Sequence, residues 1–389
     1  MIIGIIEVMP KGHFTLVDSI ARIYASDPSN TVYLFTTETG AEELKYLTNE
    51  IPQKLKIISK GSMSVVNFLR DIKKYNLDKI FITTINKYFC DFFEFLDNRR
   101  VHLFIHDINY WFDVSLKFKF YTFIKGFTLS PRMAYTIKFS LIYPFFYKKV
   151  IKKVINSGGK FVILNAILKN ELEKYINSEI IEIIPFSVFN QNQFSKISHN
   201  GLLRVTIPGH ISQLRRDYFN LLKMIEENFQ AFINKVEFEL LGCIEIGGQG
   251  EEIFRMAKKI IKLGVNVIYY EKKYISMPDY DKRLSEADLI LGNMNIKLDK
   301  YSSYGKTKDT GIIFTMIRAA KPGIVITGYP VINELKSSTL VYSNYDELKN
   351  ILIDLTNNPD KLKYLKNEAY KNSLKFEPSK LYKELENNL

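Results

Sequence analysis

The sequence predicts an α/β protein made of two doubly wound, Rossmann-like domains facing a cleft. Short β-branched and aromatic runs alternate with helical periodicity along most of the 389 residues, a pattern typical of βαβ units. A polar stretch interrupts this alternation near the middle of the chain, and the alternation then restarts. A chain of this length is also expected to form more than one hydrophobic core.

The first half begins with the apolar run Ile2–Glu7, which has the length of a buried strand. It lacks a basic leader and a small-residue cleavage site, so we expect a strand here and not a signal peptide. Helical patterns follow at Thr15–Ala25 and Val65–Tyr75. The further strands expected in this half are Thr31–Thr36, Lys54–Ile58, Lys79–Thr84, Val101–Ile105 and Phe161–Leu164.

The second half repeats the pattern. Its expected strands are Leu203–Ile207, Glu237–Leu241, Asn266–Tyr270, Leu289–Leu291, Gly323–Thr327 and Thr339–Tyr342. Its expected helices are Tyr218–Ala231, Glu251–Leu263, Tyr280–Ala287, Gly311–Ala320, Tyr345–Asn357, Asp360–Leu374 and Ser379–Asn388. We therefore expect a first domain at 1–189, a linker at 190–201, a second domain at 202–374 and a C-terminal segment, 375–389, that packs back on the first domain.

Composition excludes several classes of protein. Cys90 and Cys243 lie far apart without CxxC or Cys/His spacing, so neither a disulfide framework nor a zinc site is indicated. No run of about 20 apolar residues offers a transmembrane helix. The chain is expected to work in the cytoplasm.

The net charge of +12 is concentrated in Val114–Ile155, which holds nine lysines and arginines, eleven aromatic residues and no acidic residue. Cations interleaved with aromatic rings suit the inner face of an anionic membrane. Two core helices with lysines on their outer faces would give the same pattern. Nucleic acid is disfavoured because no binding motif is visible. The expected membrane face includes Lys148, Lys149, Lys152 and Lys153.

The segment Tyr304–Gly311, with sequence YGKTKDTG, predicts a phosphate-binding loop. It leads into an expected helix, and the free N–H groups at a helix start favour an anion. The alternative is a solvated lysine loop before an ordinary helix.

Four stretches of the second half together resemble the GT-B glycosyltransferases: Ile207–Tyr218, Leu241–Glu252, Tyr280–Asn293 and Asn358–Phe376. The resemblance implies that the second domain binds a nucleotide-diphosphate sugar and that the first binds the acceptor. In such enzymes basic side chains and a helix start neutralise the leaving diphosphate, so no metal or other cofactor is expected. The candidate phosphate ligands are Arg215, Arg216, Lys306, Lys308, Thr310 and Gly311, and the candidate donor-side turn is Gly209 and His210.

The sequence departs from this family at two positions. The glycogen-synthase-like branch has two glutamates where this chain has Thr307 and Thr315. The anomeric outcome therefore cannot be carried over. Asp279 and Asp281 form a bare DxD pattern at an expected helix start, and we interpret Asp279 as an N-cap rather than a metal ligand.

The acceptor side should be built by loops after the first-domain strands. Gly12 allows close backbone approach, and either His13 or Asp107 could serve as the general base of an inverting reaction. His13 and Asp107 could equally be helix caps, and Glu7 is a weaker candidate for the base. His106 resembles the cleft histidine that many GT-B enzymes place near the donor sugar.

These features predict a glycosyltransferase that moves a sugar from a nucleotide donor to a saccharide or lipid-linked saccharide, as in bacterial-type surface polysaccharide assembly. A nucleotide-sugar epimerase of the same fold, or a glycosyltransferase-like binding protein without turnover, is the alternative. An NAD-dependent dehydrogenase is disfavoured because no GxGxxG follows the first strand.

Overall fold

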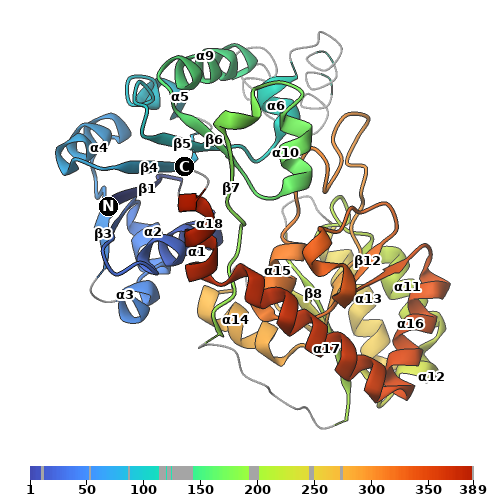
Figure 1. The fold of residues 1–389 in the computed structure, drawn as a ribbon. Coiled ribbons are helices and arrows are strands. Elements are labelled where there is room, and N and C mark those ends of the chain that lie inside the picture. Colours follow the sequence, from blue (N-terminus) through green and yellow to red (C-terminus); the bar gives the residue numbers. More distant parts are fainter. Residues whose placement is uncertain are drawn as a thin grey trace. The chain divides into compact units, whose positions relative to one another are not determined.

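The computed structural model describes residues 1–9, 13–51, 54–85, 88–113, 120, 124, 143–191, 201–244, 249–271 and 275–387. The chain forms two compact units (Figure 1). The first unit is Met1–Phe186 with Asp299–Asp309, and the second is Ser187–Leu298 with Thr310–Leu389. Each unit contains one parallel sheet, which confirms the predicted α/β class.

The first unit has a seven-stranded sheet of order β3-β2-β1-β4-β5-β6-β7. Every pair is parallel, and β1 lies between β2 and β4 with Ile3 opposite Val32 on one side and Lys79 on the other. The strands are β1 (Ile2–Glu7), β2 (Thr31–Thr36), β3 (Leu55–Ser59), β4 (Lys79–Thr84), β5 (Val101–Phe104), β6 (Lys160–Ile163) and β7 (Ile181–Ile183).

Most helices of the first unit connect these strands and cover the sheet. Ser64 and Asn165 cap two of them, because each side chain accepts a backbone N–H of the first helical turn. The helices are α1 (Phe14–Ala25), α2 (Glu38–Glu43), α3 (Tyr46–Glu50), α4 (Val65–Ile72), α5 (Phe89–Phe92), α6 (Ile108–Phe112), α9 (Tyr143–Asn156) and α10 (Ala166–Leu172), with 3-10 turns η1 (Lys73–Tyr75) and η4 (Ser178–Ile180).

The second unit has a six-stranded parallel sheet of order β10-β9-β8-β11-β12-β13. Alternate β8 residues Leu203, Val205 and Ile207 join the main hydrophobic core, as the period of two in a strand requires. The strands are β8 (Leu203–Pro208), β9 (Val236–Leu241), β10 (Asn266–Tyr269), β11 (Leu289–Gly292), β12 (Gly323–Ile326) and β13 (Thr339–Tyr342).

The helices of this unit cover both faces of its sheet. In Figure 1, α11, α13 and α16 pack together on one side, and α14, α15 and α17 on the other. The elements are α11 (Tyr218–Glu227), α12 (Phe229–Phe232), α13 (Gly250–Lys262), α14 (Met277–Glu286), α15 (Ile312–Ala319), η6 (Asn333–Ser338), α16 (Tyr345–Asn357), α17 (Pro359–Ser373), η7 (Leu374–Phe376) and α18 (Pro378–Asn387).

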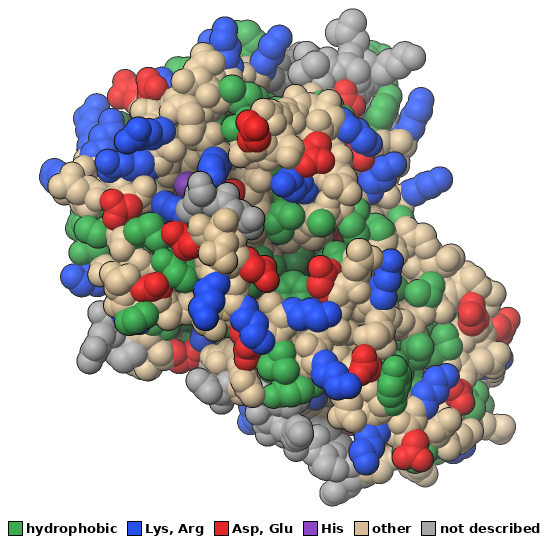
Figure 2. Space-filling view, in the orientation of Figure 1, with side chains coloured by type: hydrophobic (Ala, Val, Ile, Leu, Met, Phe, Trp, Pro, Cys, Tyr) green, Lys and Arg blue, Asp and Glu red, His purple; other side chains and the backbone are tan. Residues whose placement is uncertain are grey.

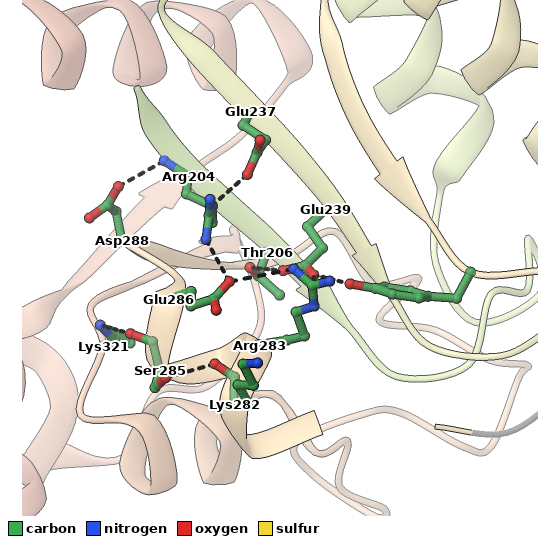
Figure 3. Close-up of polar contacts among 11 residues, drawn as sticks. Arg204, Thr206, Glu237, Glu239, Lys282, Arg283, Ser285, Glu286, Asp288 and Lys321 are labelled. Carbon is green, nitrogen blue, oxygen red and sulfur yellow. Dashed lines mark hydrogen bonds and ion pairs between the residues drawn. The ribbon is translucent and has the colours of Figure 1, made fainter. Parts of the chain in front are cut away.

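A polar layer separates β8 and β9 from α14 (Figure 3). Arg204 forms ion pairs with Glu237 (2.5 Å) and Glu286 (2.8 Å). The buried Glu239 carboxylate accepts the hydroxyl of Thr206 at 3.0 Å. Burial raises the pKa of Glu239, although its hydrogen bonds oppose the shift. These charges are paired with one another, which is what allows them to lie inside the unit.

Three expectations about the domain organisation were not confirmed. Asp299–Asp309 belongs to the first unit, although the sequence places it inside the second domain. Most of the expected linker, 192–200, lies outside the described residues. The C-terminal helix forms as α18, and its packing on the first domain stays a prediction.

Candidate functional sites at the two sheet switch points

The first candidate site lies where the strand order of the first sheet reverses, between β1 and β4. Ligands of open α/β sheets bind at the carboxyl ends of the strands at such a point. Glu7 ends β1, and Thr83 and Thr84 end β4. The sequence prediction singled out Glu7 but not the two threonines, because nothing in a buried strand marks which hydroxyls will meet.

Glu7 is fully buried, and its carboxylate accepts four hydrogen bonds. The donors are the N–H of Met9 (2.9 Å), the N–H of His13 (3.2 Å) and the hydroxyls of Thr83 (2.8 Å) and Thr84 (3.1 Å). Burial raises the pKa of Glu7, and the four bonds oppose that shift. By accepting the N–H groups of Met9 and His13, Glu7 fixes the ends of the loop between β1 and α1.

His13 stacks on His106, with ring centroids 3.9 Å apart. The His106 Nε2 lies 2.7 Å from the Thr83 carbonyl oxygen, which can only accept. Nε2 therefore carries the proton, and Nδ1 keeps its lone pair. Burial lowers the pKa of His106 to about 4, and burial also lowers the pKa of His13 well below its usual value. Both rings are neutral at pH 7.

Asp107 lies in the loop after β5, directly after His106, and its carboxylate has two partners. Its Oδ1 accepts the N–H of Tyr110 at 3.4 Å, so it caps α6, and its Oδ2 lies 3.6 Å from the Lys308 Nζ. Burial raises the pKa of Asp107, and the Lys308 ammonium opposes that shift. The structure therefore brings His13, His106, Asp107 and Lys308 together within the first unit.

The second candidate site lies where the other sheet reverses, between β8 and β11. Gly209 turns the chain after β8 with φ of +100°, and a Cβ there would lie 2.8 Å from the Arg216 guanidinium. Arg216 is buried and its Nη2 donates to the Pro208 carbonyl oxygen. Only glycine suits this turn, because both its backbone angle and the space above it exclude a side chain.

The start of α15 lies at the same edge of the second sheet. A Cβ at Gly292, the last residue of β11, would meet Ile312 Cγ2 at 3.1 Å, so the two segments touch. Ile312 donates its N–H to the Thr310 hydroxyl at 3.3 Å. Asn293 follows β11 and is 1% exposed, and neither polar atom of its side chain has a partner among the described residues. The sequence prediction missed Asn293, because an asparagine after a strand usually signals only a turn.

The remaining predicted site residues are His210, Arg215, Lys306 and Gly12. His210 is exposed, with Nδ1 3.7 Å from the Cys243 sulfur, and Arg215 is half-buried. Lys306 is exposed on the segment that carries Lys308. Gly12 lies outside the described residues.

The DxD aspartates are engaged in other contacts. Ser276, not Asp279, is the N-cap of α14, so the N-cap prediction was wrong; the helix begins at Met277, two residues before Asp279. Asp279 instead accepts the Ser276 hydroxyl at 2.8 Å, and Asp281 pairs with Arg318 at 2.6 Å. Within the described ranges, no group of three or more His, Cys, Asp and Glu could hold a metal ion.

Helix α9 carries the lysines predicted to face a membrane. Tyr147, Val150 and Val154 bury one face of this helix. Phe145 and Ile155 are 58% and 41% exposed on the other face, where three of the four lysines, Lys148, Lys149 and Lys152, are also exposed. The fourth, Lys153, is partly covered: its ammonium lies 4.4 Å from the centre of the Phe93 ring and 3.4 Å from the Asp97 carboxylate. Figure 2 shows basic side chains projecting at the top of the view, where α9 lies in Figure 1. No helix in the described part is both long and apolar enough to cross a membrane.

No protein-family model matches this chain, and no curated protein matches it by sequence. Solved structures do match over its whole length. HepE from Anabaena, in complex with UDP, is 13% identical with a TM-score of 0.55, covering 99% of this chain and 98% of HepE. A glycosyltransferase from Rickettsia africae is 13% identical with a TM-score of 0.59, covering 100% and 97%. The pneumococcal O-GlcNAc transferase GtfA, in complex with UDP and GlcNAc, is 9% identical with a TM-score of 0.58, covering 100% and 98%. The chain therefore has the two-domain GT-B fold of these glycosyltransferases, as the sequence resemblance predicted.

Proposed function

We propose that this protein is a glycosyltransferase that moves a sugar from a nucleotide-diphosphate sugar to a saccharide or lipid-linked saccharide. The observation that carries the proposal is that a GT-B fold presents polar and ionisable side chains at the switch point of each of its two sheets. HepE and GtfA were solved with UDP bound, so UDP-sugars are the first donors to test.

The donor diphosphate is assigned to the second unit, at the start of α15. The positive end of a helix dipole favours an anion, and Thr310 and Gly311 lie directly before the first turn of α15. Arg215 adds positive charge at the same edge, and Lys306 and Lys308 precede Thr310 in the chain. These groups can neutralise the leaving diphosphate without a metal ion.

The acceptor is assigned to the switch point of the first unit. The neutral His106 Nδ1 can accept a hydrogen bond from a sugar hydroxyl. His13 or Asp107 takes the hydroxyl proton if the reaction inverts configuration. If the reaction retains configuration, the leaving phosphate can take it.

A donor panel with excess EDTA tests the proposal. Thermal shift with UDP, GDP, TDP and CMP identifies the base, because a nucleotide at a hundredfold excess over its dissociation constant should stabilise the fold by about 2.7 kcal/mol. Acceptor-dependent release of nucleotide is the expected activity. Interconversion of free nucleotide sugars without release identifies an epimerase, and binding without turnover identifies a binding protein. Activity that EDTA abolishes and magnesium restores would contradict the metal-free mechanism.

A second part of the proposal concerns location: α9 docks the protein on the inner face of an anionic membrane. Phe145, Lys148, Lys149, Lys152 and Ile155 recur at helical spacing on one face, so rings and cations meet the surface together. Each cation near an anionic surface adds about 1 kcal/mol. Such docking would bring a lipid-linked acceptor to the enzyme.

Liposome sedimentation decides this point. Wild type should bind vesicles containing anionic lipid at low ionic strength, and a variant with Lys148, Lys149 and Lys152 changed to glutamate should not. A matched variant with three exposed lysines of the second unit changed to glutamate, Lys223, Lys258 and Lys262, has the same net charge and should still bind. Equal binding by all three proteins, or by none, would leave α9 as an ordinary surface helix.

A further inference from the structure

The segment Asp299–Asp309 packs on the first unit through contacts that include the side chains of Asn109 and Asn165. We propose that Asn109 and Asn165 are positioning residues that hold this segment so that the Lys308 ammonium pairs with Asp107, the residue next to His106. The contacts that define this role are observed in the structure, and only its consequence for catalysis rests on the proposed function.

Two amides and one backbone bridge hold the segment. The Asn109 Nδ2 donates to the Tyr301 carbonyl oxygen at 2.7 Å, and the Asn165 Nδ2 donates to the Asp309 carboxylate at 2.5 Å. Between them, Asp107 and Lys308 form an antiparallel bridge. Both asparagines are 5% exposed, so these contacts are shielded from water.

The bridge between Asp107 and Lys308 is held by a backbone hydrogen bond. Ile108 donates its N–H to the Thr307 carbonyl oxygen at 3.0 Å. Together with the two amides, this bond fixes the segment on both sides of Lys308.

The segment is also ordered internally, so holding its ends fixes its centre. Gly305 has φ of +78° and donates its N–H to the Lys308 carbonyl oxygen at 2.7 Å. The Thr307 hydroxyl bonds with the Ser303 backbone. The Asp299 carboxylate accepts the N–H of Ser302 at 2.8 Å. A displaced Asn165 contact should therefore move Lys308 as well.

The position of Lys308 has an electrostatic consequence for the stacked rings. The charged and titratable groups around them are Glu7 from β1, Asp107 after β5 and Lys308, with Asp299 close enough to act on Asp107. Burial is the main cause that lowers the pKa of both histidines, and Lys308 adds to it. Withdrawing the ammonium should raise the pKa of both rings.

Asn165→Asp is the sharpest variant, because it separates two roles of one side chain. The Asn165 Oδ1 caps α10 by accepting the Leu168 N–H at 2.9 Å, and aspartate caps a helix equally well. The new carboxylate would face Asp309 and repel it. Asn165→Ser also keeps a capping oxygen and merely lacks the amide donor.

The matched control is Asn177→Asp. Asn177 caps the exposed turn η4 and its amide also donates to a carboxylate, that of Glu179, at 3.2 Å. The same change in charge and in capping is thus made in the same unit, away from the candidate site.

The experiment is an NMR titration of the histidine Cε1–Hε1 signals in the full-length protein, with His13→Asn and His106→Asn for assignment. Lys308→Met sets the reference. The pKa of His106, about 4 in wild type, should rise in Lys308→Met and should rise in the same direction in Asn165→Asp, Asn165→Ser and Asn109→Asp. Asn177→Asp should leave it unchanged.

Two results would overturn the inference. Unchanged histidine pKa values in the Asn165 and Asn109 variants, with a shift in Lys308→Met, would show that the amides do not place the lysine. Unchanged values in Lys308→Met would show that the lysine charge does not act on the rings. Neither readout needs a substrate, so a failure of the proposed function, seen as absent nucleotide binding in wild type, is distinguished from a failure of this inference.

Discussion

Removing the Glu7 carboxylate should destabilise the first unit and disturb the chain that carries His13. Glu7→Ala leaves the N–H groups of Met9 and His13 and the Thr84 hydroxyl without their acceptor, whereas the Thr83 hydroxyl keeps the Ile6 carbonyl oxygen at 3.1 Å. Each buried donor left unpaired costs about 1–3 kcal/mol, while relief of the buried charge offsets part of this. We expect a net loss of about 2–4 kcal/mol in the free energy of unfolding.

Glu7→Gln separates shape from charge. One amide oxygen can still accept from His13 and the threonines, but the amide nitrogen then faces the Met9 N–H, so a smaller loss is expected. The pH dependence has a definite sign. Since the folded pKa of Glu7 is raised above 4.5, the native state holds the proton more tightly. The stability contribution of Glu7 therefore falls as pH rises from 4.5 through the folded pKa, and Glu7→Gln removes that dependence.

Urea unfolding followed at several pH values, with nucleotide titration at each, measures both effects. Nucleotide affinity should survive, because Glu7 contacts none of the groups assigned to the diphosphate. The exposed Glu42→Gln serves as the control. If Glu7→Ala unfolds at the same urea concentration as wild type, the four hydrogen bonds do not hold this part of the chain, and the reasoning fails.

Three further predictions concern charge. Lys308→Met should weaken nucleotide-diphosphate binding by about 10–150-fold, which is the equivalent of about 1.5–3 kcal/mol for a charge-assisted contact. Lys306→Met should weaken it by less, because Lys306 is more exposed. Unchanged affinity of both variants in calorimetry would exclude Tyr304–Gly311 as the phosphate-binding loop. Burial would raise the pKa of Glu182, but hydrogen bonds from His102 and Lys160 hold it at about 2. Glu182 should therefore contribute about 3 kcal/mol to the free energy of unfolding above pH 4.5, and this contribution should be lost as pH falls toward 2. Glu182→Gln should lose that amount at pH 7 and little at pH 2.5, and equal losses in urea unfolding at both would exclude this ion pair. Since the pKa of His106 is about 4, kcat/KM should stay level from pH 8 to 5 and fall below that, and a limb near 6.5 would contradict a buried neutral ring.

The sheets could be predicted from the sequence because buried parallel strands are short apolar runs between helical patterns. Ile2–Glu7, Thr31–Thr36 and Lys79–Thr84 were predicted with their observed bounds. Short helices such as α5 and α6 were not predicted, because four or five residues give too little periodicity. Tyr218–Ala231 was predicted as one helix and is two, α11 and α12, with a break at Asn228.

The candidate site was predictable only as a set of strand ends. Residues that directly follow strands, such as His106 and Asp107, could be proposed because parallel strands end at one edge. The partners that fix them could not. Asn165 contacts Asp309 across 144 positions of sequence, and no local pattern reports such a contact. For the same reason, Lys308 was predicted beside the second domain and is found with the first unit.

A crystal structure with a bound nucleoside diphosphate tests the central claim most directly. UDP is the first choice, followed by whichever nucleotide gives the largest thermal shift. The diphosphate is expected at the start of α15, beside Thr310 and the Gly209 turn. A nucleotide bound at the opposite end of the second sheet, or no binding of any nucleotide at millimolar concentration, would contradict it.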